Sequence, residues 1–147
     1  MLANAYARTY RTNAVLTASP GQLVLMLYDG VLKSLALARE AFAQPGDDPR
    51  RIEIINQQLI KAQNILLELQ AGLNLEAGGE FAQTMHRLYD YHTRRLLQAN
   101  LQKKVEPVIE VERLVTELRD AWAEMLGKHD GSGRPAVASG GLVAVAS

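Results

Sequence analysis

The sequence predicts an all-α protein, folded as an antiparallel up-down four-helix bundle. Four segments carry apolar residues at alternating steps of three and four, and each is bounded by residues typical of helix starts and stops. No stretch sustains the alternation of apolar and polar residues that a half-buried strand requires. Segments of about 25 residues form helices roughly 35 Å long, and short links between long helices favour antiparallel neighbours.

The first helix is predicted to begin at Ser19-Pro20-Gly21-Gln22 and to end near Gln44, before Pro45-Gly46. Ser19 can accept a hydrogen bond from a free amide of the first turn, and Gln22 can complete a capping box. Pro20 fits a position that needs no amide partner. The first helix is therefore well bounded at both ends.

Apolar residues occupy most of the circumference of this first helix. One stripe contains Leu23, Leu27, Val31, Leu35, Ala38 and Phe42, and a second contains Leu25, Tyr28, Leu32 and Ala36. A helix this apolar either lies centrally in its own core or also faces a partner. The pattern alone favours neither of these interpretations.

The other three segments have their own boundaries. The second begins with Asp48 as cap and Pro49 as first helical residue, the third starts at Glu80 after Gly78-Gly79, and the fourth has Pro107 as its first helical residue. The third is expected to end between Asn100 and Lys103. Their predicted core positions are Ile52, Ile55, Leu59, Ala62, Leu66, Leu69 and Leu73, then Phe81, Met85, Leu88, His92, Leu96 and Ala99, then Val108, Val111, Val115, Leu118, Trp122 and Met125.

Two further parts flank the bundle, which is assigned to residues 19–126. Residues 1–18 form an N-terminal arm in which Leu2, Tyr6 and Tyr10 can share one helical face. Residues 127–147 are rich in Gly and Ala and are expected to form a flexible tail. The apolar residues Leu142, Val143 and Val145 of this tail are suited to docking on an apolar groove.

Composition excludes several classes of function. The chain has 147 residues, the size of one domain, and 16 basic and 16 acidic residues give a net charge of zero, which argues against nucleic acid as the main partner. It has no cysteine, so disulfides and thiolate metal sites are excluded. The N-terminus lacks the apolar core of a secretory signal, and Asp29 and Lys33 interrupt the most apolar stretch, Leu23 to Ala38. We therefore expect a cytoplasmic protein without stable membrane insertion.

No pattern of catalytic or metal-binding residues occurs. A di-metal site in a bundle would require Glu-x-x-His motifs, and none is present. His86 and His92 lie six residues apart and do not share a face; we interpret His86 as a surface residue and His92 as partly buried with a local hydrogen bond. No nucleophile elbow, phosphate loop or dinucleotide fingerprint is found. We predict no catalytic residue, metal or cofactor, and a protein that is not an enzyme.

An ordered set of short motifs carries a resemblance. It comprises Val15-Leu16-Thr17-Ala18-Ser19-Pro20 with Leu23, Met26-Leu27-Tyr28-Asp29-Gly30, Lys61-Ala62-Gln63 with Ile65, Leu69, Leu73-Asn74, Gly78-Gly79-Glu80, Leu88-Tyr89-Asp90-Tyr91, Arg94-Arg95-Leu96, Ala99-Asn100, Leu118-Arg119 and Ala121-Trp122. Each motif alone is weak. In this order, over about residues 4–126, the set resembles the flagellin-specific export chaperone family, FliS.

The resemblance implies a function in bacterial flagellum biogenesis. Such a flagellar secretion chaperone binds the disordered C-terminal region of flagellin in the cytoplasm, prevents premature polymerisation and assists delivery to the flagellar export apparatus. The residues expected to bind this client are Tyr10, Val15, Leu16, Leu23, Leu27, Tyr28, Leu96, Ala99 and Asn100. The resemblance further implies that the arm covers part of the client groove in the free protein.

Three alternatives stay open at this stage. The chain is equally consistent with a helical-bundle adaptor for a different amphipathic-helix client, because the groove would have the same pattern. A bundle enzyme or metal carrier is disfavoured by the missing ligand motif. In the third alternative, the apolar stripes pair between subunits, so weak self-association is also considered.

Overall fold

The computed structural model describes residues 19–132, and side chains are described for residues 19–128. This part of the chain consists of four α-helices: α2 (Pro20–Ala43), α3 (Pro49–Ala71), α4 (Gly79–Gln102) and α5 (Glu106–Ser132). No strand occurs between residues 19 and 132. The predicted all-α fold is confirmed. The N-terminal arm and residues 133–147 lie outside the described part.

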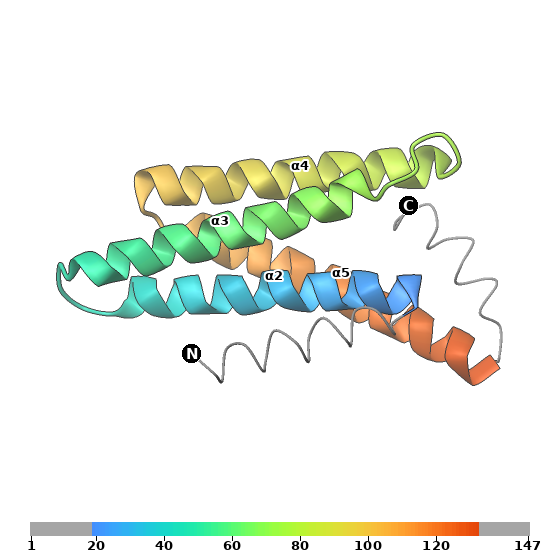
Figure 1. Cartoon of the computed structure of the whole chain (residues 1–147), viewed down its shortest axis with the longest axis horizontal. Helices are drawn as coiled ribbons and strands as arrows, with labels where there is room; N and C mark the ends of the chain where they lie inside the picture. The colour runs from blue at the N-terminus through green and yellow to red at the C-terminus, as the bar shows by residue number, and fades with distance from the viewer. Residues whose placement is uncertain (1–18, 133–147) are drawn as a thin grey trace, which may run out of the picture.

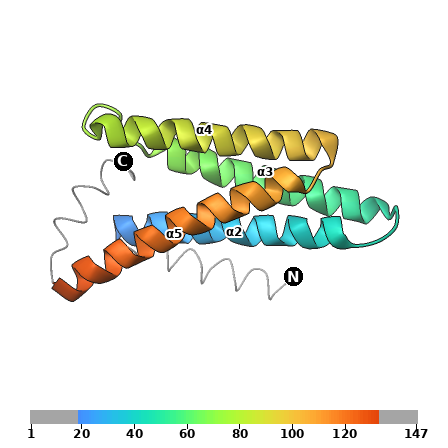
Figure 2. The ribbon, with the colours of Figure 1, turned by 180° about the vertical axis from the view of Figure 1, so that it is seen from behind.

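Successive helices run in opposite directions, as the predicted up-down bundle requires (Figure 1). Helix α2 packs against α3 and α5, and α4 packs against the same two helices from the other side. Seen from behind, α5 crosses α2 obliquely instead of running alongside it (Figure 2). The bundle is therefore closed in the order α2, α3, α4, α5.

The helix boundaries follow from the capping residues. The Ser19 hydroxyl accepts a hydrogen bond from the Gln22 amide at 3.2 Å, and the Gln22 side-chain oxygen accepts one from the Ser19 amide at 3.3 Å. The Asp48 carboxylate accepts a hydrogen bond from the Arg50 amide at 3.0 Å. Lys103, with φ 51°, ends α4 in the left-handed conformation. The predicted caps of the first two helices are thus confirmed.

Replacing Ser19 by alanine is expected to lower the free energy of unfolding by about 0.5–2 kcal/mol, because the first-turn amides lose their acceptor. Ser19→Asp should retain most of the stability, since a carboxylate also caps and suits the helix N-terminus. Thermal unfolding of both variants tests the capping role. Equal losses in the two variants would contradict it.

The core is formed by the predicted stripes, with two exceptions. Ile55, Leu59, Ala62 and Leu66 of α3 are completely buried, and the buried set extends through all four helices. Ile52 and Phe81 were expected in the core, but they are 40% and 51% exposed. Each lies in the first turn of its helix, where fewer neighbouring side chains cover the stripe.

Helix α5 is longer than expected. It continues past Leu126 through Ser132, so residues 127–132, assigned to a flexible tail, are helical. An ion pair between Lys128 and Glu124 at 3.2 Å, one turn apart, supports this extension. Gly127 has no neighbour that would contact an added Cβ, so this end of α5 is open to solvent.

His92 is completely buried, and its predicted local hydrogen bond is absent. Neither ring nitrogen has a hydrogen-bond partner among the described residues, and the ring meets Tyr91 edge-on with centroids 5.9 Å apart. Burial lowers the pKa of His92 to about 4, against the opposing attraction of Glu110. The core therefore holds His92 in its neutral form.

This burial predicts a loss of stability in acid. Unfolded histidine takes up a proton near pH 6.5, whereas folded His92 resists until about pH 4. The unfolded state thus binds more protons, and stability falls as the pH drops through this window, by up to about 3 kcal/mol from this group (2.5 pH units at 1.36 each). Urea unfolding at pH 7 and pH 4 should show a smaller acid loss for His92→Leu than for the natural chain. If the variant and the natural chain lose the same stability between pH 7 and pH 4, His92 is not the cause of the acid loss.

Helix α2 is long and apolar enough to cross a membrane by length and composition alone, despite Asp29 and Lys33. The sequence-based expectation that these two charges disqualify the segment is therefore not met. In the structure, however, α2 packs against α3 and α5 and supplies core residues such as Val31 and Leu35. Core helices share this composition, so the observation is weak support for a membrane span.

Candidate functional site

Many of the residues in the recognised motifs hold the bundle together. The hydroxyls of Tyr28 and Tyr89 lie 2.6 Å apart in the core and share a hydrogen bond between α2 and α4. Burial raises the pKa of both hydroxyls, so both stay protonated at neutral pH. This pair satisfies two polar groups that would otherwise be costly to bury.

Helices α2 and α5 are joined by two further motif contacts. The Arg119 guanidinium donates to the Asp29 carboxylate at 2.8 Å, and the Trp122 indole nitrogen donates to the Gly21 carbonyl at 2.9 Å. Helix α3 approaches α2 closely at Gly30, where an added Cβ would lie 3.2 Å from the Ile65 Cδ1 atom. These residues thus have packing roles that require no partner.

Polar side chains bridge the outer edge between α3 and α4. The donors and acceptors are spaced two helical turns apart along α3: Asn100 Nδ2 to Asn56 Oδ1 at 2.8 Å, Gln63 Nε2 to the Thr93 carbonyl at 3.1 Å, and Gln70 Nε2 to the His86 carbonyl at 3.0 Å. The matching motif residues Gln63 and Asn100 therefore fix the register of the antiparallel α3/α4 pair.

The predicted client-binding residues are placed very differently. Tyr28 is 2% exposed, and Leu96 and Ala99 are fully buried, so a direct contact with a partner would require helices to separate. Leu23 and Leu27 are partly exposed on α2. Asn100 is also partly exposed, but it pairs with Asn56 near the start of α3. The remaining three, Tyr10, Val15 and Leu16, lie outside the described residues.

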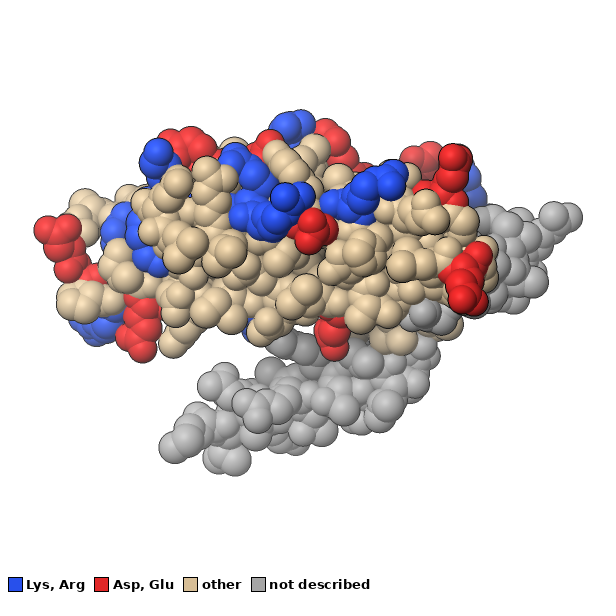
Figure 3. Space-filling view, turned by 90° about the horizontal axis from the view of Figure 1, so that it is seen from above, with Lys and Arg blue, Asp and Glu red and all other residues tan. Residues whose placement is uncertain are grey.

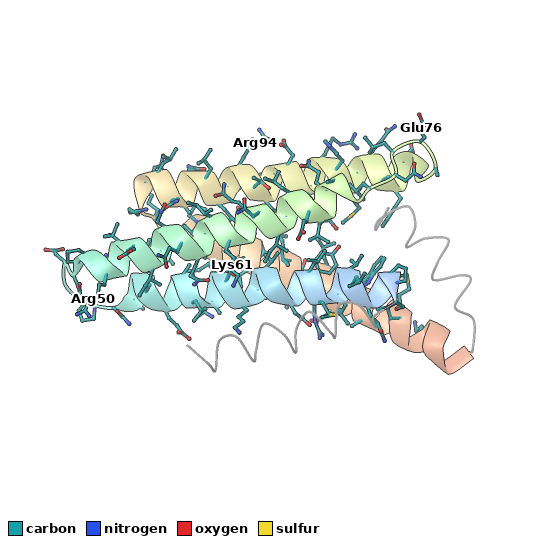
Figure 4. The ribbon with its side chains drawn as sticks, viewed as in Figure 1. Arg50, Lys61, Glu76 and Arg94 are labelled. Carbon is teal, nitrogen blue, oxygen red and sulfur yellow. The ribbon has the colours of Figure 1, made fainter. Side chains whose placement is uncertain are left out.

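The partly exposed leucines belong to a larger surface, which we call the α2 apolar row: Leu23, Met26, Leu27 and Leu37. These positions recur at helical spacing on the side of α2 that faces Ile65 and α3. Lys61 is the only charged residue of α3 between Glu53 and Glu68, and it lies on the side of α3 toward α2 (Figure 4). The row is thus apolar around Leu23 and Leu27, whereas Lys33 lies on the same face between Met26 and Leu37.

A groove lies on the side of α2 that points away from Leu23 and Leu27. It has a volume of about 630 Å³ and runs between α2 and α5; the lining residues are Leu32, Lys33, Ala36, Ile109, Glu112, Arg113, Thr116 and Glu117. Its apolar floor includes Ile109, which is 48% exposed. The α2/α5 groove was not predicted from the sequence, although the second apolar stripe of α2, with Leu32 and Ala36, was its signal.

The outer face of α3 and α4 also exposes aliphatic side chains, namely Ile60, Leu67, Leu97 and Leu101. Figure 3 looks onto the α4 side of the molecule, where charged side chains gather in clusters and broad uncharged areas lie between them. On α4, Arg94 and Asp90 form an ion pair at 3.0 Å. Apolar surface is therefore spread over several faces of the bundle.

Within the described residues, no group of three or more His, Asp or Glu side chains is placed to hold a metal ion. The surface offers apolar strips and grooves bordered by charged rims. Such surfaces suit amphipathic helices.

Comparison with known proteins decides the family. A model of the family described as "Flagellar protein FliS" matches residues 2–129. The chain belongs to the FliS family. The match includes all of α2, α3 and α4 and most of α5, and it excludes the last residues of the chain.

Curated relatives agree with this assignment. The flagellar secretion chaperone FliS of Bacillus subtilis is 45% identical over 117 residues, covering 80% of this chain and 83% of that protein. The proteins of the same name from Salmonella typhimurium and Escherichia coli are each 42% identical, over 84% and 83% of this chain and 89% and 87% of their own length. The family is thus one of flagellar secretion chaperones, a non-enzymatic role.

Proposed function

We propose that this flagellar secretion chaperone binds the disordered C-terminal segment of flagellin in the cytoplasm, prevents its premature polymerisation and assists its delivery to the flagellar export apparatus. The α2 apolar row carries the proposal, because it leaves Leu23 and Leu27 partly exposed on a helix that also supplies the core. Membership of the FliS family supports the same assignment.

The physical mechanism is helix-in-groove recognition coupled to folding of the client. An amphipathic segment that becomes helical on the α2 apolar row removes its own apolar face and that of Leu23 and Leu27 from water. Ordering the client costs about 2–5 kcal/mol or more, which limits the affinity for a given contact area and eases later release. Binding and release of this kind require no nucleotide, cofactor or catalytic group.

The predicted contacts also suggest that the client wraps around the bundle. The row residues Leu23 and Leu27 lie near the start of α2, whereas Asn100 lies near the end of α4 and pairs with Asn56 of α3. Because α2 and α3 are antiparallel, Asn56 lies beside the end of α2. A client helix that covers only Leu23 and Leu27 does not extend to Asn100, so a contact there requires a further part of the client.

Titration with a peptide covering the C-terminal segment of the flagellin of the same organism tests the proposal. We expect saturable one-to-one binding by calorimetry and a gain of helix by circular dichroism. Absence of binding to the folded chain, with its arm removed, would instead favour an adaptor for a different amphipathic-helix client. Sizing of the free protein at several concentrations measures any self-association.

We further propose that the N-terminal arm covers part of the client surface in the free protein. Deleting residues 1–14 should then tighten flagellin binding, because the peptide no longer displaces an intramolecular competitor. Calorimetry on the full and shortened chains measures the difference. Weaker binding after the deletion would make the arm part of the binding surface.

A further inference from the structure

The α2/α5 groove has a floor that favours an apolar occupant. Leu32 and Ala36 from α2 meet Ile109 from α5 in a space of about 630 Å³. Leu32 and Ala36 lie on the other side of α2 from Leu23 and Leu27, so the groove is separate from these two proposed flagellin contacts. An aliphatic segment placed there would remove the floor from water.

The rim of the groove indicates that this occupant is uncharged. Arg113 pairs with Glu117 at 3.7 Å within α5, and Glu112 pairs with Arg39 of α2 at 2.9 Å. Three of the four charged lining residues, Glu112, Arg113 and Glu117, therefore have partners of opposite sign, whereas Lys33 has no ion-pair partner among the described residues. A charged segment would have to compete with the existing pairs, whereas an uncharged one leaves them intact.

The chain itself contains a segment with this chemistry. Residues 135–147 carry no charged side chain, and they include Leu142, Val143 and Val145 among small residues. The segment follows α5, which forms one wall of the groove. It also lies beyond residues 2–129, the part of the chain that matches the FliS family.

The segment is long enough to reach the groove. Ser132 is sixteen positions after Thr116, a distance of about 24 Å along α5 at 1.5 Å per residue. The ten residues from 133 to 142 span about 33 Å when extended at 3.3 Å per residue. Leu142 can therefore reach the near end of the groove if the chain turns back along α5, and the residues after it can continue toward Ile109.

We propose that residues 135–146 fold back antiparallel to α5 and that their last part, from Leu142, occupies the α2/α5 groove, with Leu142, Val143 and Val145 against Leu32, Ala36 and Ile109. Tethering keeps the segment at an effective concentration on the order of millimolar, so modest contacts are enough for occupancy. The groove is open to solvent along its length, which lets water satisfy the backbone amides of an extended segment.

The natural absence of cysteine allows a clean test on the full chain. A nitroxide attached to Ser139→Cys should erase the methyl signals of Leu32 and Ile109 in the NMR spectrum. The signals of Ile60 and Leu97, on the outer face of α3 and α4, should persist. Retention of the Leu32 and Ile109 signals, or equal loss on both faces, would overturn the proposal.

Substitutions in the tail and in the groove test the assigned contacts separately. Replacing both Leu142 and Val143 by aspartate in the labelled chain should restore the groove signals, and Ile109→Asp should restore that of Leu32. Ile60→Asp is the matched control, since Ile60 is 43% exposed and Ile109 48%, and it should change nothing. Continued loss of the Leu32 signal in the tail variant would contradict the assigned contacts, even if Ile109→Asp failed to fold.

A mixed sample separates this arrangement from contact between two copies. Nitroxide-labelled chain without isotopes is mixed with isotope-labelled chain that carries no nitroxide. The proposal predicts full groove signals in this mixture. Their loss would assign the groove to the tail of a second copy. Neither measurement uses flagellin, so failure here leaves the proposed client binding untouched.

Discussion

Replacing Leu96 by alanine is expected to lower the free energy of unfolding by about 2–5 kcal/mol, because its side chain is fully buried and its removal leaves a cavity. Leu97, the next residue, is 47% exposed, and Leu97→Ala should change stability by no more than about 0.5 kcal/mol. Urea unfolding of the two variants compares a core and a surface leucine on the same turn of α4.

The Leu96 result also decides between two roles suggested by the sequence. If Leu96 serves the core, peptide binding per folded molecule should stay within about twofold of the natural chain. A Leu96→Ala variant that keeps its stability and loses flagellin binding would contradict its placement in the core.

The fold could be predicted from the sequence because its signals are local. Ser19 and Asp48 cap their helices through contacts two or three residues away. The buried positions of α3 follow one stripe, from Ile55 to Leu69, that any partner helix would cover. The predicted burial was wrong only at Ile52 and Phe81, which lie at the ends of their stripes. Burial at a stripe end depends on how far the neighbouring helices extend.

The candidate site was less predictable, since motif residues with structural and functional roles look alike in sequence. Tyr28 matches the family motif, yet its hydroxyl is satisfied by Tyr89, which is 61 residues away in the chain. Gly30 has a packing explanation only once Ile65 is seen against it. The predicted hydrogen bond of His92 was wrong for a similar reason, because the sequence around a histidine does not reveal whether its ring nitrogens have a hydrogen-bond partner.

Replacing Leu23 and Leu27 together by alanine is expected to weaken flagellin-peptide binding by about 10–100-fold. Burying a leucine side chain contributes up to about 1.5–3 kcal/mol, and each 1.4 kcal/mol corresponds to a factor of ten in affinity. Both side chains remain partly exposed in the free protein, so this surface is available for burial against a client helix. Calorimetric titration measures the loss.

Ile109→Ala is the matched control for this double variant, because it removes an exposed aliphatic side chain of α5 that lines the α2/α5 groove. Its binding should stay within about twofold of that of the natural chain. Leu27 also packs against the core, so the unfolding midpoint of the double variant must show that the bundle persists. A folded double variant with unchanged affinity, together with weakened binding by Ile109→Ala, would move the client from the α2 apolar row to the α2/α5 groove. In that case the client and the tail segment proposed above would compete for one surface.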